Sequence, residues 1–427
     1  MIFNKFPSNI KVRLVLQFFI IFSTMTVQPF LIIYFSKHLG TTATGFLVMM
    51  VISVSIIGAL IGGFLSDRLG RKKIIIYSEF VIFLGYCSLA LFNSSWMDSI
   101  YISFCIILGI KFFESAIIPV YQALIIDSSE EKDRKEIYSC IYWMNNIAIG
   151  LGSLIGGILF WKYKFYLFLS IGIIFLISCI VIHLKINETI TSYNSSSKNK
   201  ITMHLLLKDS VMTFKTILYD RKFIFFTIGT FLLVSIEEQL GGYISIYLEE
   251  KFHPLTLHFF SLNFPINGFN VVGILRAENT FFAVFLSLLF SKFMGNLNIN
   301  KFIKLGAICF FGGFSVLSYS TNLLLLIDFM FVATFGEVLF KLAQQVYLSS
   351  SIPSDSRSSY LAVFSFTSVA ANLTVALVLL LTDYVSTMII TVGFIFVGML
   401  SIFFNHHALN SRKMKKVTIP LQNYINN

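Results

Sequence analysis

Long apolar stretches constrain what this chain can fold into more than any other feature. They lie at 12–35, 44–66, 74–93, 98–126, 137–161, 163–185, 222–248, 271–294, 301–320, 322–348, 359–382 and 386–408. An α-helix needs roughly 20 apolar residues to cross the hydrocarbon core of a bilayer. Because 56% of the residues are hydrophobic and only 12% are charged, the polar residues are too few to cover such a surface in water. The sequence therefore predicts an all-α membrane protein with twelve transmembrane helices in two six-helix bundles.

Basic residues are distributed unevenly between the connecting segments. The chain carries 32 Lys and Arg against 21 Asp and Glu, a formal net charge of +11. With both termini placed in the cytoplasm, the outer connections hold only Lys37, Lys162, Lys164 and Lys251. This asymmetry is the positive-inside pattern, so we expect a multi-pass plasma-membrane protein with both termini cytoplasmic. The positive charge then reflects topology and contact with anionic lipid, and no nucleic-acid partner is expected.

A polar interruption over 186–221 divides the chain. It begins rich in Ser and Asn and continues over 201–220 with apolar residues at helical spacing, which predicts an amphipathic helix on the inner membrane surface. We expect an N-terminal half over 1–185, this linker over 186–221, a C-terminal half over 222–408 and a basic tail over 409–427. A weak internal repeat at one constant offset supports the two halves. It pairs Gln122, Ser128, Ser129, Asp133 and Tyr138 with Gln344, Ser350, Ser351, Asp355 and Tyr360.

A short charged segment, from Gly63 to Lys73, joins the second and third apolar stretches. Gly63 permits close approach of two helices, and Gly70 permits a tight turn. Asp67 can accept hydrogen bonds from the N-terminus of a neighbouring helix. The basic residues that can pair with acidic groups as the halves move are Arg68, Arg71 and Lys72.

This segment resembles the loop between the second and third helices of major facilitator superfamily transporters, and the resemblance covers nearly the whole chain. It implies that the segment is a conformational latch rather than a substrate site. The fifth stretch is similar to the antiporter signature of that family: it keeps the glycines at 150, 152, 156 and 157, with Ser153 in place of a proline.

Other segments are similar to lactococcal-type multidrug–proton antiporters. They are Val12-Arg13-Leu14, Ala123–Asp127 with Arg134 and Lys135, Tyr142-Trp143 with Asn146, and Gly336-Glu337-Val338. The resemblance implies buried carboxylates that carry protons and meet cationic, lipophilic drugs. Glu337 and Asp127 match acids of that branch. Two further acids of the branch fall on Ile141 and near Gly241, so the drug-binding acids are rearranged in this chain.

Acidic residues inside the apolar stretches need a role, because an ionisable group at the bilayer centre costs about 3 kcal/mol or more. Glu237 and Glu238 have no basic residue within a turn, and we interpret one of them as a proton- or cation-handling group. Glu337 precedes Lys341 by one helical turn. The two can be a self-neutralising pair, or Glu337 can be a protonatable carboxylate with Lys341 as its charge partner.

Several other charged positions leave structural and functional interpretations open. Glu114 and Lys111 can neutralise each other or take part in coupling. Arg276 is either part of an external gate or an interface anchor, and Arg13 opens the first stretch, where snorkelling explains it equally well. We expect Asp127 to bond the charged loop, which is a gating role.

The sequence thus predicts a secondary transporter that exports amphipathic or cationic small molecules in exchange for protons. A dedicated exporter of one endogenous product is the alternative, and an uptake symporter or an intramembrane enzyme fits less well. The sequence has no phosphate-binding glycine loop and no metal-ligand spacing of His or Cys, so we expect no enzyme activity, no cofactor and no metal. The expected partners are the small-molecule substrate, protons and the lipid bilayer, with the chain acting as a monomer without an obligatory protein partner.

Overall fold

The computed structural model describes residues 6–130, 133–188, 217, 219–259, 262–291, 299–352 and 357–410. Over these residues the protein is nearly all α-helical, and eleven helices are long and apolar enough to cross a membrane. One of them, α6 (Arg134–Lys185), has 52 residues and leaves the helical conformation at Tyr163 (φ −124°, ψ 30°). Since a crossing takes roughly 20 residues, α6 accounts for two of the predicted stretches. The prediction of an all-α membrane protein is confirmed.

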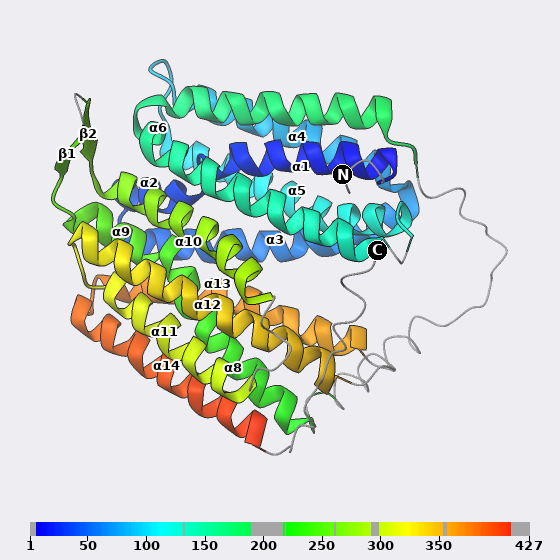
Figure 1. Cartoon of the computed structure of the whole chain (residues 1–427). Coiled ribbons are helices and arrows are strands. Elements are labelled where there is room, and N and C mark those ends of the chain that lie inside the picture. The colour runs from blue at the N-terminus through cyan, green and yellow to red at the C-terminus, as the bar shows by residue number, and fades with distance from the viewer. Residues whose placement is uncertain are drawn as a thin grey trace. The chain divides into compact units, whose positions relative to one another are not determined.

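The chain forms two compact units. The first holds the described residues up to 188 together with 248–250 and those of 254–280. Its complete helices are α1 (Ser8–Met25), α2 (Gln28–Leu39), α3 (Thr41–Leu69), α4 (Arg71–Leu91), α5 (Ile100–Asp127) and α6. Within it α1 and α4 pack against α6, and α5 packs against α3 and α4 (Figure 1).

An antiparallel hairpin also belongs to this first unit. It pairs β1 (Leu255–Phe259) with β2 (Leu262–Ile266) and leads into α10 (Gly268–Ser291), whose residues up to Thr280 belong to the same unit. The sequence did not predict this hairpin. Its residues fall between two apolar stretches and are too few to signal a sheet.

The second unit holds the described residues 217, 219–247, 251–253, 281–291, 299–352 and 357–410. It contains α8 (Arg221–Glu237), the 3-10 turn η2 (Glu238–Gly241), most of α9 (Tyr243–Lys251), the end of α10, α11 (Ile299–Leu317), α12 (Leu323–Ser351), α13 (Arg357–Thr382) and α14 (Thr387–Asn410). Here α11 packs against α12 and α14, while α8 packs against α13 and α14 (Figure 1).

Polar side chains fix where helices of the second unit begin. The carboxylate of Asp220 accepts a hydrogen bond from the Phe223 amide at 3.2 Å at the start of α8. The Asn322 side chain accepts from the amides of Leu324 and Leu325, at 3.0 and 3.3 Å, at the start of α12. Such caps satisfy amide groups that have no partner inside the helix.

Close backbone contact explains Gly156 of the fifth predicted stretch. A Cβ added at Gly156 would collide with the carbonyl of Thr26 and the ring of Phe30. Thr26 lies at the break between α1 and α2, which the sequence predicted as one span. A small residue is therefore required where α6 crosses this break.

Two predicted segments fall mainly in the part of the chain that the structure does not describe. The amphipathic helix expected over 201–220 is described only at 217, 219 and 220, and the basic tail over 409–427 only at 409 and 410, which end α14. The division of the chain by a linker at 186–221 stays a prediction.

Candidate functional site

One ammonium group joins two carboxylates inside the second unit. The Nζ of Lys341 lies 2.6 Å from a carboxylate oxygen of Glu337, one turn earlier on α12. It also lies 3.0 Å from a carboxylate oxygen of Glu237, the last residue of α8. The two helices are thus tied by charge at one point, which we call the Glu237–Lys341–Glu337 cluster.

The ion pair between Lys341 and Glu237 was not predicted from the sequence. No basic residue lies within a turn of Glu237 along the chain, and its cation comes from α12 instead. Lys341 does pair with Glu337, as the sequence interpretation allowed. The coupling role of these residues stays a prediction.

Exposure differs sharply within the cluster. The side chain of Glu337 is only 7% exposed, that of Glu237 is 27% exposed, and that of Lys341 is 44% exposed. Glu337 is therefore the more deeply buried acid, and Lys341 is the most exposed member of the cluster. Buried charges of this kind persist only when they are paired or serve a function.

A break in the helix places Glu237. After α8 the chain passes through η2, and Gly242 (φ −114°, ψ −109°) separates η2 from α9. Glu238 is the first residue of η2, so the two adjacent acids of the sequence lie at the break itself. Broken helices are typical of transporter sites, because the interrupted backbone lines a cavity or lies inside protein.

A cavity of about 350 Å³ opens next to this break. It is lined by residues of α8, α13 and α14, among them Phe231, Val378 and Phe394, and by Gln239 of η2. Gln239 is 1% exposed, and its amide nitrogen lies 3.5 Å from the Thr374 hydroxyl, which is at the limit of a hydrogen bond. Gln239 was not a predicted site residue, because its buried position depends on the helix break.

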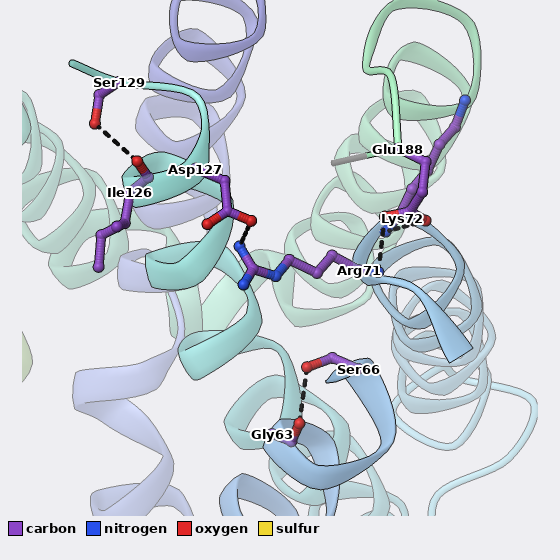
Figure 2. Close-up of polar contacts among 8 residues, drawn as sticks. All are labelled: Gly63, Ser66, Arg71, Lys72, Ile126, Asp127, Ser129 and Glu188. Atoms are coloured by element: carbon purple, nitrogen blue, oxygen red, sulfur yellow. Dashed lines mark hydrogen bonds and ion pairs between the residues drawn. The ribbon is translucent and has the colours of Figure 1, made fainter. Parts of the chain in front are cut away.

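The charged segment lies in the first unit, far along the chain from this cluster. Gly70 has φ +99° and separates α3 from α4, as the tight turn requires. Arg71, the first residue of α4, forms an ion pair with Asp127 at the end of α5 (Figure 2). The expectation that Asp127 bonds this loop is confirmed as a contact, and its gating role stays a prediction.

The carboxylate at the start of α4 comes from Glu188. Its two oxygens accept hydrogen bonds from the Arg71 and Lys72 amides at 3.0 and 3.2 Å (Figure 2). The Nζ of Lys72 donates in return to the His183 carbonyl near the end of α6, at 2.7 Å. Negative charge is favoured at a helix N-terminus and positive charge at a C-terminus, so both contacts stabilise this corner.

Glu188 does what the sequence assigned to Asp67, which is to place a carboxylate at a helix N-terminus. The side chains of Asp67 and Arg68 lie outside the described part of the structure. Gly63 belongs to α3, and its carbonyl accepts a hydrogen bond from Ser66 (Figure 2). Glu188 was not predicted as a cap, because it lies at the start of the polar linker, whose Ser- and Asn-rich composition indicated only a flexible segment.

The remaining predicted residues lie in the first unit. Lys111 and Glu114 pair at 2.7 Å on α5, and the Tyr86 hydroxyl donates to Glu114 at 3.0 Å. The Arg13 guanidinium lies 3.2 Å from the centre of the Tyr121 ring. Arg276 lies on α10 with its Nε buried. None of these contacts decides between the structural and functional interpretations.

Metal binding has no candidate among the described residues. No group of three His, Cys, Asp or Glu side chains there is placed to hold a metal ion.

Comparison with known proteins gives consistent matches over most of the chain. The model of the Major Facilitator Superfamily matches residues 14–374. The "Na(+), Li(+), K(+)/H(+) antiporter" of Planococcus maritimus is 29% identical over 361 residues, which cover 84% of this chain and 85% of that protein. The uncharacterized MFS-type transporter YdeE of Escherichia coli is 22% identical over 340 residues, 78% of each chain.

Solved structures share the fold. A POT family transporter in complex with 5-aminolevulinic acid matches with a TM-score of 0.69 and 16% identity, covering 96% of this chain and 98% of that one. The nucleoside transporter NupG matches with a TM-score of 0.70 and 13% identity, covering 94% and 100%. At such identities the matches speak for the fold alone.

Proposed function

The chain belongs to the major facilitator superfamily and is a multi-pass membrane transporter rather than an enzyme, and on this premise we propose that it exchanges protons for a cationic substrate at the Glu237–Lys341–Glu337 cluster. The observation that carries the proposal is the position of Lys341, within 3.0 Å of both carboxylates. It gives a membrane-embedded site whose charge changes when one proton is bound.

The charges of the cluster support exchange. With all three groups ionised, two carboxylates and one ammonium leave a single excess negative charge. One proton or one monovalent cation neutralises that excess, and both together would reverse it. Because uncompensated charge inside the membrane is costly, the two ligands exclude each other, and mutual exclusion at one site produces antiport.

Lys341 links binding to movement. A proton on Glu337 or Glu237 neutralises one of the two carboxylates that bind the ammonium. The ion pair between Lys341 of α12 and Glu237 of α8 then becomes stronger or weaker, depending on which acid is protonated. The break at η2 lets the end of α8 respond without unwinding the whole helix. In the first unit, we propose that Arg71 and Asp127 form a latch that breaks and reforms as the transporter changes state.

The cargo that we propose is an amphipathic organic cation, which the transporter exports. The cavity beside η2 has about 350 Å³ and a predominantly hydrophobic lining. Cavities of roughly 300–1,000 Å³ with such linings are typical of small-molecule sites. The similarity of several segments to multidrug–proton antiporters supports the same cargo.

A second candidate cargo is a monovalent metal cation. The Planococcus maritimus relative, which matches 84% of this chain, is named as a Na(+), Li(+), K(+)/H(+) antiporter and favours this cargo. The same carboxylates would serve, because Glu237 and Glu337 oxygens are hard ligands for such ions.

Transport by purified protein tests the proposal and separates the cargoes. Proteoliposomes with an imposed pH gradient and an internal pH-sensitive dye receive tetraphenylphosphonium, ethidium, NaCl, LiCl or KCl. We expect the organic cations to dissipate the gradient in wild type and not in Glu237→Gln or Glu337→Gln. Response to the salts alone would favour the metal-cation cargo.

A matched control comes from the same helix. Asp328 is an exposed acid of α12 outside the cluster, so Asp328→Asn removes an acid while leaving the site intact. It should transport like wild type. No response of wild type to any of the five probes would refute the proposal.

A further inference from the structure

A second buried carboxylate lies in the first unit, at Glu79 of α4. Its side chain is completely buried. One oxygen, Oε1, accepts hydrogen bonds from the Tyr121 hydroxyl of α5 and from the Ser178 hydroxyl of α6, the latter at 2.9 Å. The other oxygen, Oε2, has no hydrogen-bond partner among the described residues.

The neighbouring cation, Arg13, forms no ion pair with this carboxylate. The Arg13 guanidinium stacks on the Tyr121 ring, 3.2 Å from its centre, while the hydroxyl of the same ring donates a hydrogen bond to Glu79. Within the described residues, Nε and Nη1 of Arg13 are buried without a hydrogen-bond partner. A buried acid and a buried base thus share Tyr121 without forming an ion pair.

The hydrogen bonds fit a neutral carboxylic acid. In that form Oε1 is the carbonyl oxygen, which accepts both hydroxyl bonds, and Oε2 carries the proton. An ionised carboxylate would leave a buried, charged oxygen without any donor, which is far more costly than a buried hydroxyl. The contacts of the two oxygens therefore favour the protonated form of Glu79.

We propose that Glu79 is a second proton-binding site of this transporter, and that Arg13 pairs with it when the proton leaves. Loss of the proton creates a negative charge, and Arg13 can neutralise it with its two unpartnered N–H groups by moving off the Tyr121 ring. The bond that breaks is O–H at Oε2, and water accepts the proton. The remaining titratable group that faces Glu79 is the Cys179 thiol of α6.

Such a movement would reach the charged segment. Glu79 lies about two turns after Arg71 on α4, and Tyr121 lies about two turns before Asp127 on α5. A change between Glu79, Tyr121 and Arg13 therefore alters the helices that carry the Arg71–Asp127 pair. The role of Glu79 in transport rests on the proposed function. The protonation of Glu79 does not depend on that function.

Infrared difference spectroscopy of the full chain in lipid nanodiscs tests the protonation directly. A protonated carboxyl group gives a C=O stretching band that shifts in D₂O. We expect this band in wild type and in Glu237→Gln/Glu337→Gln, and we expect it to be lost in Glu79→Gln. An unchanged band in Glu79→Gln would overturn the proposal.

Ser178→Ala provides a second variant, which keeps the acid and removes one donor to Oε1. Because fewer hydrogen bonds strengthen the C=O bond, the band should move to higher frequency in this variant. An unmoved band would contradict the assignment even if Glu79→Gln failed to fold. Band loss in Glu79→Gln without proton-coupled transport in wild type would uphold the site and refute only the proposed function.

Discussion

At the scale of single residues, Lys341 holds the candidate site together. It is 44% exposed, yet its ammonium is shared between carboxylates of two helices. Replacing it leaves Glu237 and Glu337 facing each other without a cation. The consequence is electrostatic and can be separated from the effect of shortening a side chain.

The Lys341→Gln variant should be less stable than wild type by about 1–3 kcal/mol, less than for a fully buried pair because the side chain is partly exposed. Thermal unfolding in detergent measures the loss. The double variant Lys341→Gln/Glu337→Gln has the same net charge as wild type and should recover part of the stability. Equal stability of wild type and Lys341→Gln would show that the bridge contributes nothing.

Residue partners were the least predictable part of the site. The sequence identified Glu237, Glu337 and Lys341 because charge inside an apolar stretch is unusual. It could not show that Lys341 reaches Glu237, since that contact joins helices separated by about a hundred residues. Glu79 carries the same signal, because it lies inside the apolar stretch 74–93, but it was not predicted, and its hydrogen-bond donors come from α5 and α6.

At the scale of elements, the corner at α4 depends on a carboxylate from outside the helix. Glu188→Gln should lower stability by about 1 kcal/mol, because it removes the negative charge next to two N-terminal amides. Hydrogen exchange should show faster opening of the first turn of α4.

Asp133→Asn is the matched control for this cap. Asp133 precedes α6 but makes no side-chain hydrogen bond to it, so the change should leave stability within a few tenths of a kcal/mol of wild type. Equal effects of the two substitutions would mean that Glu188 is not a specific cap.

The break between η2 and α9 gives a second prediction for elements. A Cβ added at Gly242 would collide with the side chain of Val375 and lie 3.4 Å from Oε1 of Gln239. Gly242→Ala should therefore slow transport while helix content measured by circular dichroism stays unchanged. Gly312→Ala is the control, because a Cβ there meets no atom within 4 Å. Wild-type transport by Gly242→Ala would exclude a role for the break.

Helix positions followed closely from the sequence, whereas their interruptions did not. The length of each apolar stretch fixed the span, so 322–348 corresponds to α12 and 359–382 to α13. The break at Thr26 is followed by Pro29, and η2 begins within the polar run Glu237-Glu238-Gln239, but the apolar stretches continue on both sides of each interruption. Tertiary packing determines such interruptions, and a hydropathy pattern carries no information about tertiary packing.

At the scale of the whole molecule, the account requires protons and cations to compete. Where the cluster is mostly protonated, each unit of falling pH should weaken the apparent affinity for the cation about tenfold, because one proton must leave for each cation bound. Initial rates of cation uptake into proteoliposomes, measured at several external pH values, test this. An apparent affinity independent of pH would exclude competition at a shared site.

Proton release on cation binding tests whether one proton or one cation occupies the Glu237–Lys341–Glu337 cluster. Purified protein in weakly buffered solution with a pH indicator is titrated with tetraphenylphosphonium or NaCl. We predict proton release by wild type and Asp328→Asn, and none by Glu237→Gln/Glu337→Gln. Cation binding by wild type without proton release, or undiminished release by the double variant, would contradict the account.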